Sequence, residues 1–210
     1  KNRKKELRSK IMKVIVAGTV AIDDVKTPKV ERTGLMGGSA SYAAMACSFF
    51  APTRIVGIIG KDFPKEHITT LENNGICTEG IERSEGDSFY WSGEYHENMD
   101  DRTTHDVAIN VLEAYEPKIP ESYFDTELVL LANMSPRNQI DVLDQCSNAK
   151  YSIADTMDIW INNERDELIE LLRKIDLLVI NESEAQLFME TRNLVRAGKK
   201  LMGLGPKNVI

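Results

Sequence analysis

Short apolar segments alternate along this chain with segments whose apolar residues recur every three or four positions. The apolar segments predict buried strands at 13–20, 54–59, 81–83, 127–132, 151–154 and 176–180. The segments between them predict helices at 63–74, 136–146, 161–174 and 190–202, and one from Ser39, its N-cap, to a stop at Pro52. Because strands and helices alternate, the pattern predicts an α/β fold with a parallel sheet covered by helices on both faces.

A second pattern begins at Phe89, where aromatic residues alternate with polar ones as far as Tyr95. This period of two predicts a strand with one aromatic face, and a Thr-rich extended run at 102–107 follows a turn at 97–101. The two runs are predicted to form a hairpin or small sheet apart from the α/β pattern. The aromatic face, which includes Trp91, can stack on a ring-shaped ligand, bury against a second subunit, or simply pack in the core.

Composition and charge narrow the classes of protein to consider. A chain of 210 residues can form one domain with a sizeable core, and its net charge of −7 argues against nucleic acid as the main partner. The basic segment 1–11 is followed by no sustained apolar run, so it is interpreted as a solvated tail or a leader, with Met12 a candidate initiator, and not as a signal peptide. No apolar run approaches the length of a membrane span.

The cysteines and histidines indicate a reducing compartment and no zinc site. The cysteines are odd in number and far apart, which fits reduced thiols in the cytoplasm better than disulfides: Cys47, Cys77 and Cys146. The histidines share no metal-ligand spacing and are interpreted as surface or structural residues: His67, His96 and His105.

A glycine pair, Gly37-Gly38, separates an extended segment from a helix of small residues that begins at Ser39. Glycines beside a helix N-terminus with free backbone N–H groups allow the backbone to approach a small polar ligand. An ordinary tight turn between helix and strand explains the same residues, because a lone glycine pair is a weak motif.

The stretch that starts at Leu35 also resembles a known family. Its glycine pair, small-residue helix, Val-Gly-Ile-Ile-Gly strand and following Lys-Asp-Phe-Pro resemble the first signature of the ribokinase-like (PfkB) carbohydrate kinases. The resemblance implies a three-layer α/β/α fold with a mostly parallel sheet over 12–210, and a small β-sheet lid formed mainly by about 27–34 and 84–112. It also implies that Gly37 and Gly38 contact a sugar. This chain has Tyr42 where the family usually has Asn, which indicates a divergent subgroup and makes Tyr42 a candidate substrate contact at that position.

The same resemblance assigns roles to polar residues that follow the predicted strands. It implies that an Asp after the first strand accepts hydrogen bonds from substrate hydroxyls, here Asp24, with Asp23 as the alternative. Asn133, Asp155 and Asn181 follow later strands, and ligands of parallel sheets bind at such strand ends. We predict a substrate contact for Asn133, whereas Asp155 or the nearby Asp158 can equally cap a helix.

The pair Asn181 and Glu184 forms a second motif of the resemblance. The two residues are three positions apart at the start of a helix, which places both side chains on one face of its first turn. The ribokinase-like family has Asn-x-x-Glu here, where it arranges magnesium-bound water and phosphates. We therefore expect Asn181 to contact the nucleotide and Glu184 to contact Mg²⁺, with water molecules bridging these contacts. A carboxylate at a helix N-terminus is otherwise only a stabiliser of the helix dipole.

The resemblance therefore implies an ATP- and Mg²⁺-dependent kinase that phosphorylates a hydroxyl of a sugar or nucleoside and forms a homodimer through its lid. The family's second signature, Gly-Ala-Gly-Asp with the catalytic base, is absent from these residues, and the chain stops inside a predicted strand at 207–210. A non-catalytic sugar- or nucleoside-binding module that dimerises through the lid is the alternative. A Rossmann dehydrogenase is disfavoured, because no Gly-x-Gly-x-x-Gly follows the first strand.

Overall fold

The described residues form a central sheet of seven strands in which every neighbouring pair runs parallel. The computed structural model describes residues 12–99 and 101–210, so the predicted tail at 1–11 lies outside the described residues. Across the sheet the strands are β11 (Asn208–Val209), β10 (Leu177–Val179), β9 (Tyr151–Asp155), β8 (Leu128–Leu131), β1 (Val14–Ala17), β4 (Thr53–Ile59) and β5 (Ile76–Arg83). This architecture confirms the parallel α/β fold that the sequence predicts.

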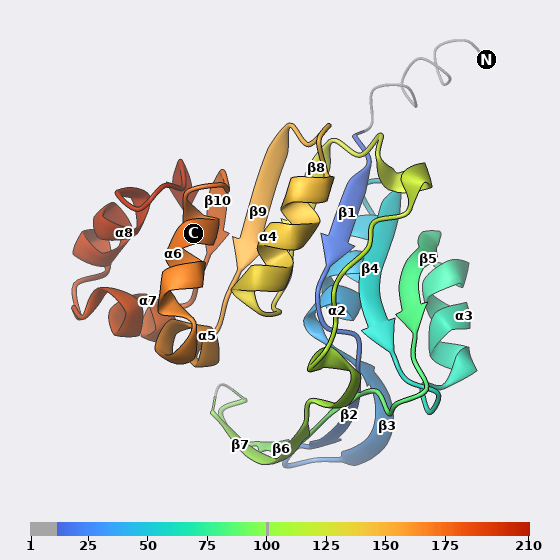
Figure 1. Ribbon diagram of the computed structural model, residues 1–210. Coiled ribbons are helices and arrows are strands. Elements are labelled where there is room, and N and C mark those ends of the chain that lie inside the picture. Colours follow the sequence, from blue (N-terminus) through green and yellow to red (C-terminus); the bar gives the residue numbers. More distant parts are fainter. Residues whose placement is uncertain (1–11, 100) are drawn as a thin grey trace.

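Helices cover both faces of the sheet (Figure 1). Successive side chains of β1 show this, because they pack alternately into a core on one face and a core on the other. Ile15 and Ala17 pack into a core with residues of α4 (Pro136–Gln145), α6 (Arg165–Leu172), α7 (Glu182–Met189) and α8 (Leu194–Met202). Val14 and Val16 point the other way, toward α2 (Ser39–Ser48) and α3 (Lys65–Asn73). A strand buried on both sides reads as a continuous apolar run, which is why the sequence identifies β1.

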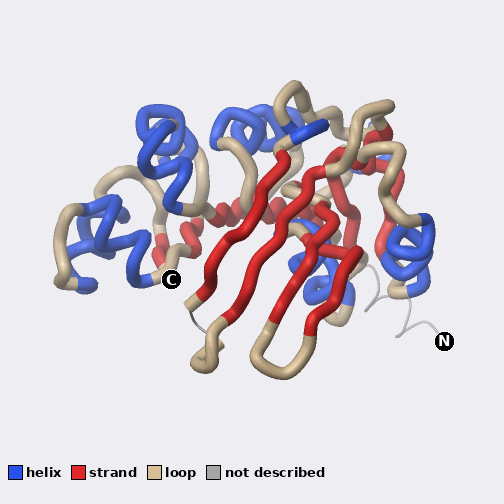
Figure 2. Tube along the Cα trace, turned by 90° about the horizontal axis from the view of Figure 1, so that it is seen from below, coloured by secondary structure: helices blue, strands red, loops and turns tan. Residues whose placement is uncertain are grey.

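A second sheet of four strands lies beneath the carboxyl ends of the central strands (Figures 1 and 2). Its order is β3 (Glu31–Gly37), β2 (Ala21–Lys26), β6 (Phe89–Tyr95) and β7 (Arg102–Ala108). We call it the lid sheet. Two antiparallel hairpins, β2–β3 and β6–β7, meet along a parallel pairing of β2 with β6. The predicted β6–β7 hairpin is confirmed. The other hairpin extends beyond the predicted segment 27–34 on both sides, since β2 precedes that segment and β3 begins within it and runs on to Gly37.

Several predicted boundaries are wrong. The strand predicted at 81–83 is longer than expected, since β5 already begins at Ile76 and pairs with β4 from there. The expected helix at 161–174 is two helices, α5 (Asp158–Asn163) and α6, because Glu164 between them leaves helical geometry at φ −131° and ψ 44°. The helix expected from 190 begins at Leu194, since Glu190 adopts a left-handed conformation with φ 51°. The strand expected at 13–20 ends at Ala17, and the chain then crosses into β2.

One part of the central sheet is less well covered than the rest. Ile153 of β9 and Leu177 of β10 are register partners on one face, are partly exposed, and belong to neither core.

Two short 3₁₀ helices, η1 (Asn110–Leu112) and η2 (Glu121–Tyr123), lie in the connection from the lid sheet back to β8. No helix in the described part of the chain is long and apolar enough to cross a bilayer.

Candidate functional site

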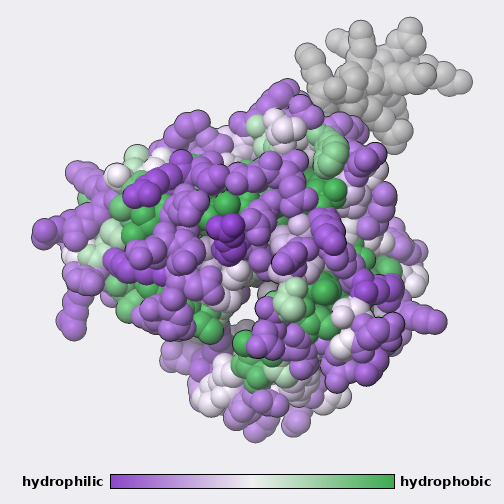
Figure 3. Space-filling view, in the orientation of Figure 1, coloured by the Kyte–Doolittle hydropathy of each residue, from purple (hydrophilic) through white to green (hydrophobic). Residues whose placement is uncertain are grey.

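A cavity of about 540 Å³ lies between the lid sheet and the carboxyl ends of the central strands. Figure 3 shows the surface hollowed between the lid sheet and the rest of the molecule, with hydrophobic residues on both sides. Ligands of parallel sheets bind at this edge because the loops that follow the strands meet there. The predicted site residues that line the cavity are Gly38, Tyr42, Asn133, Asn181 and Glu184. Asp24 and Gly37 are not among its lining residues.

Asp23, and not Asp24, directs its carboxylate toward the cavity. Asp23 lines the cavity and is the register partner of Trp91 on the aromatic face of the lid sheet. The Asp24 carboxylate lies on the opposite face, where it accepts hydrogen bonds from the Tyr90 hydroxyl at 2.9 Å and the Gly34 N–H at 2.7 Å. The geometry therefore favours the alternative, Asp23, over the preferred Asp24 as the carboxylate that faces the cavity, because successive residues of a strand face opposite sides.

The environment of Asp23 favours its neutral form. Burial, with a smaller contribution from the neighbouring charge of Asp24, raises the pKa of Asp23 from 3.8 to about 6. Ligand groups that donate hydrogen bonds to this carboxylate stabilise its charged form and thereby bind favourably. The hydroxyls of a polyol are donors of this kind.

Each glycine of the pair permits a close approach that a side chain would block. A Cβ on Gly38, where φ is +90°, would lie 2.3 Å from the carbonyl oxygen of Thr19. A Cβ on Gly37 would lie 2.0 Å from the Asp23 carboxyl carbon, so Gly37 makes room for the Asp23 side chain without lining the cavity itself. The pair thus shapes the site through the backbone.

The start of α2 differs from the prediction in two respects. Gly38 is the N-cap and Ser39 is already the first residue of the helix, so the predicted Ser39 cap is wrong. Thr19 occupies the first N–H groups: its Oγ1 accepts from Ser39 N at 3.0 Å and its carbonyl accepts from Ala40 N at 3.0 Å. These bonds hold α2 against the loop after β1 and leave fewer helix N–H groups for a ligand than expected.

Asn133 is fixed in the cavity wall by two neighbouring segments. Its backbone carbonyl accepts from the Ser39 hydroxyl at 3.0 Å. Its side-chain Oδ1 accepts from the Trp160 indole N–H at 2.7 Å, and its Nδ2 lies 3.0 Å from the Met157 sulfur. Beneath it, the buried Gln139 amide donates to the carbonyls of Leu131, Ala132 and Asp155, which ties the end of β8 to the end of β9. The strand ends are therefore held rigidly together.

Asn181 and Glu184 form a reciprocal capping box at the start of α7. The Asn181 side chain accepts from the Glu184 N–H at 2.9 Å, and the Glu184 carboxylate accepts from the Asn181 N–H at 3.1 Å. This arrangement satisfies two N–H groups at the helix terminus and accounts for the spacing of the motif without a ligand. Both residues also line the cavity, so the cap places them beside any ligand there.

Acidic side chains near Glu184 make that end of the cavity negative. Burial and the charges of Asp155 and Asp158 raise the pKa of Glu184, while hydrogen bonds from Asn181 oppose the shift. Burial likewise raises the pKa of Asp155, which lines the cavity at the end of β9. Asp158 lies in the first turn of α5. Among residues 12–99 and 101–210, no group of three or more His, Cys, Asp or Glu side chains is arranged to hold a metal ion.

The aromatic residues of the lid sheet face the cavity. Phe89, Trp91 and Tyr95 line it from β6, and the rings of Trp91 and Tyr95 are 6.2 Å apart. Tyr42 lines the cavity from α2 and is 61% exposed. Of the three roles open to the aromatic face, this placement favours contact with a ligand over contact with a second subunit.

The comparisons with known proteins agree on one fold. No family model matches the chain. A cytidine kinase from Thermococcus kodakarensis is 26% identical over 204 residues, which span 95% of this chain and 72% of that protein. The structure of an Arabidopsis thaliana ribokinase complexed with ribose and ATP matches with a TM-score of 0.72 at 18% identity, over 95% of this chain and 71% of the ribokinase.

A nucleoside kinase from Methanocaldococcus jannaschii, an archaeal member of the ribokinase family, matches with a TM-score of 0.70 at 15% identity, over 90% of this chain and 68% of that one. The chain has the ribokinase-like fold. The resemblance drawn from the sequence motifs is thus confirmed, including the small sheet beside the parallel sheet. Within this ribokinase-like fold, sequence reasoning missed Thr19 and Met157 in the cavity wall, and Trp160, which holds Asn133 from behind, because no local motif marks them.

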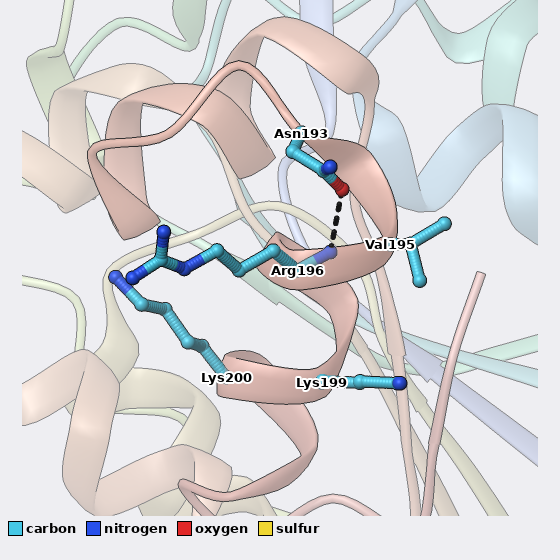
Figure 4. A pocket seen from close by; sticks show the side chains of 5 residues that line it. All are labelled: Asn193, Val195, Arg196, Lys199 and Lys200. Atoms are coloured by element: carbon cyan, nitrogen blue, oxygen red, sulfur yellow. Dashed lines mark hydrogen bonds between the residues drawn. The ribbon is translucent and has the colours of Figure 1, made fainter.

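A separate depression of about 470 Å³ lies on α8, away from the strand ends. Figure 4 shows Arg196 and Lys200 extending to one side and Lys199 to the other, while Asn193 Oδ1 accepts from the Arg196 N–H at 2.9 Å and caps the helix. The three basic side chains come from one helix and do not share a direction, and Lys200 Nζ already donates to the Met189 carbonyl at 3.0 Å. We therefore place the candidate site in the cavity under the lid sheet of the ribokinase-like fold.

Proposed function

We propose that this chain binds a sugar or nucleoside in the cavity under the lid sheet, and that its protein is a kinase that transfers the γ-phosphoryl group of ATP to a hydroxyl of that ligand. The observation that carries the proposal is the cavity itself. A carboxylate, an amide and exposed backbone gather at the carboxyl ends of parallel strands, in Asp23, Asn133 and Gly38. The relatives support it, because they are a cytidine kinase, a ribokinase and a nucleoside kinase.

In this proposal the residues of the chain bind and orient the acceptor. The Asp23 carboxylate accepts hydrogen bonds from ligand hydroxyls, and Asn133 contributes its amide. The aromatic face of the lid sheet, with Phe89 and Trp91, shields the site from water. In the transfer the acceptor oxygen bonds to the γ-phosphorus, the bond from that phosphorus to the bridging oxygen breaks, ADP leaves and the hydroxyl proton is released.

For Mg²⁺ and the nucleotide, we propose Glu184 and Asn181 as contacts through water. Burial, and to a smaller extent the charges of Asp155 and Asp158, raises the pKa of Glu184, and a cation here would offset both effects, which supports a magnesium ion near this end of the cavity. The capping box uses one oxygen of the Glu184 carboxylate, Oε2, which accepts from the Asn181 N–H. The other oxygen, Oε1, takes no part in the cap. When bound, Mg²⁺ would neutralise the charge of the phosphates.

The same proposal includes a homodimer in the cytoplasm. The outer face of the lid sheet carries Asp24, Tyr90 and Glu94, and the lid sheet forms an unpaired edge at β7 on which a second copy can pair. Each of the three cysteines has a free thiol, which fits a reducing compartment. Light scattering after size-exclusion chromatography gives the mass, and a monomer at every concentration would contradict the dimer.

The proposal is tested by titrating the full chain with pentoses, hexoses and nucleosides in a calorimeter and by measuring ADP release with ATP and Mg²⁺. We expect at least one ligand to bind, and Asp23→Asn to weaken that binding while Asp24→Asn leaves it unchanged. Acceptor-dependent ADP release supports the kinase. A chain that neither binds a sugar or nucleoside nor releases ADP contradicts the proposal.

A non-catalytic sugar- or nucleoside-binding module is the second candidate. Two observations favour it: the capping box already explains the spacing of Asn181 and Glu184, and no metal-binding cluster is found among the described residues. Binding of a sugar or nucleoside without acceptor-dependent ADP release would select this function over the kinase.

A further inference from the structure

A second cavity of about 460 Å³ adjoins the first beneath the lid sheet. The two share part of their walls, formed by Thr19, Phe89, Trp91, Arg102, Asn133 and Met157. The rest of the second cavity is mostly apolar and includes Val107, Ile109, Leu112, Met134 and Trp160. A ligand that filled only the first cavity would leave this apolar wall in contact with water, so burial of an apolar group here would add to affinity.

The Asn133 amide stands between the two cavities in a fixed orientation. The Trp160 indole N–H can only donate, so the amide atom 2.7 Å from it is the oxygen Oδ1. The amide nitrogen Nδ2 therefore faces the other way, where its neighbour is the Met157 sulfur at 3.0 Å. A thioether is a weak acceptor, and Nδ2 carries two hydrogens, so a donor is left for a ligand.

We propose that the ligand of this site carries a flat ring that occupies the second cavity, and that the Asn133 amide, oriented by Trp160, donates a hydrogen bond to an acceptor atom of that ring. The proposal rests on the proposed function and adds to it the class of acceptor: a sugar bearing a heteroaromatic ring, as in a nucleoside, in preference to a free sugar. The sugar lies by Asp23 and Gly38, and the ring packs against Phe89 and Trp91. Trp160 is a positioning residue, since it acts through Asn133.

The class of acceptor is tested by calorimetry on the full chain with cytidine, adenosine and ribose as probes. We expect the better nucleoside to bind at least about tenfold more tightly than ribose, because it buries the ring and gains one hydrogen bond. If ribose binds as tightly as both nucleosides, the inference is overturned while the proposed function stands. If none of these probes nor any other sugar binds, the proposed function itself fails.

The role of Trp160 is tested with Trp160→Phe, which keeps an aromatic ring and removes the indole N–H. We expect affinity for the nucleoside to fall by about tenfold while affinity for ribose stays constant. A purely structural role would weaken both ligands alike. Tyr151→Phe is the matched control, because it removes an aromatic hydroxyl from the end of β9 that lies away from the cavity. That hydroxyl accepts from the Asn208 amide at 3.3 Å.

A second variant keeps the test decisive if Trp160→Phe does not fold. Asn133→Asp retains an oxygen for the Trp160 N–H but replaces the donor Nδ2 by an acceptor. We expect this variant to lose affinity for the nucleoside by about tenfold or more. An Asn133→Asp protein that binds the nucleoside as tightly as the unmodified chain would overturn the inference.

Discussion

Asp23 and Asp24 are consecutive residues of β2, yet their carboxylates serve opposite faces of the lid sheet. Asp24 joins the two hairpins of the lid sheet, since it accepts from Tyr90 of β6 and from Gly34 of β3. Asp23 lines the cavity instead, across the sheet from that network. One carboxylate therefore holds the lid sheet together, and the other is available to a ligand.

Exchanging each carboxylate for an amide separates these two roles. We expect Asp24→Asn to lower the free energy of unfolding by about 1 kcal/mol, because a charged acceptor of two hydrogen bonds is replaced by a neutral one. We expect ligand affinity to change little in this variant. Asp23→Asn should instead weaken ligand binding by tenfold or more. Calorimetric titration and urea unfolding measure the two effects, and equal losses of affinity in both variants would contradict the assignment.

The raised pKa of Asp23 predicts how stability and binding depend on pH. The pKa is about 6 in the folded protein against 3.8 for an unperturbed carboxyl, so the folded state holds the proton more tightly than the unfolded chain. The stabilising effect of this proton is fully present below pH 4 and is lost as the pH rises through about 6. Asp23→Asn should therefore be more stable than the unmodified chain at neutral pH, by about 1 kcal/mol once solvent screening of this partly exposed group is allowed for, and equally stable below pH 4.

The same ionisation acts on the ligand in the opposite sense. Hydroxyl donors favour the charged carboxylate, so affinity should rise with pH through about 6 in the unmodified chain. Titrations between pH 5 and pH 8, a range chosen to span that value, check this at constant ionic strength. An affinity that is flat in the unmodified chain, or that rises equally in Asp23→Asn, would show that another group is responsible.

Gly38 is predicted to tolerate no side chain. Gly38→Ala would place a Cβ 2.3 Å from the Thr19 carbonyl at a φ of +90°, so α2 must shift or the backbone must remain strained. We expect a loss of about 2 kcal/mol or more in the free energy of unfolding, together with weaker ligand binding. Gly198→Ala is the matched control, because a Cβ there meets nothing within 4 Å in the middle of α8. It should stabilise the protein by about 0.5–1 kcal/mol.

The capping box and the proposed magnesium contact make different predictions for Asn181 and Glu184. As a cap, Asn181→Ala should cost about 1 kcal/mol of stability, while Asn181→Asp should cost little because Asp caps equally well. As a contact for magnesium-bound water, Glu184→Gln should raise the Mg²⁺ concentration needed for half-maximal ADP release. Thermal unfolding and a magnesium titration measure these separately. If Glu184→Gln alters only stability, the residue is a cap alone.

The periodicity of the sequence was sufficient for most of the fold. The aromatic alternation from Phe89 to Tyr95 predicts β6 residue for residue, and the apolar run of β4 is recovered to within one residue. The break between α5 and α6 at Glu164 was not predictable, because neither Gly nor Pro marks it and the apolar residues on its two sides, Ile161 and Leu168, are seven positions apart, as in one continuous helix. Local spacing reports which side chains share a face, but not where the backbone leaves a helix.

The candidate site was predictable only where a local motif marks it. The glycine pair and the strand-end Asn133 follow from sequence position, whereas the choice of Asp23 over Asp24 depends on pairing of β2 with β6. That pairing joins Asp23 to Trp91, far away in the sequence. Trp160 likewise reaches Asn133 across 27 positions, and its own neighbours in the chain carry no sign of that bond. Such contacts are decided by tertiary structure.

The lid sheet is built from two hairpins that meet only along the β2–β6 pairing. Each hairpin is local in sequence, but its first strand follows within a few residues of a central strand, β2 after β1 and β6 after β5. The β2–β6 pairing therefore brings together residues far apart in the sequence, such as Ala21 and Phe89, and non-local strand pairing of this kind slows folding. In refolding experiments the ligand cavity should consequently be the last part of the molecule to form, after the barrier to assembling the central sheet has been crossed.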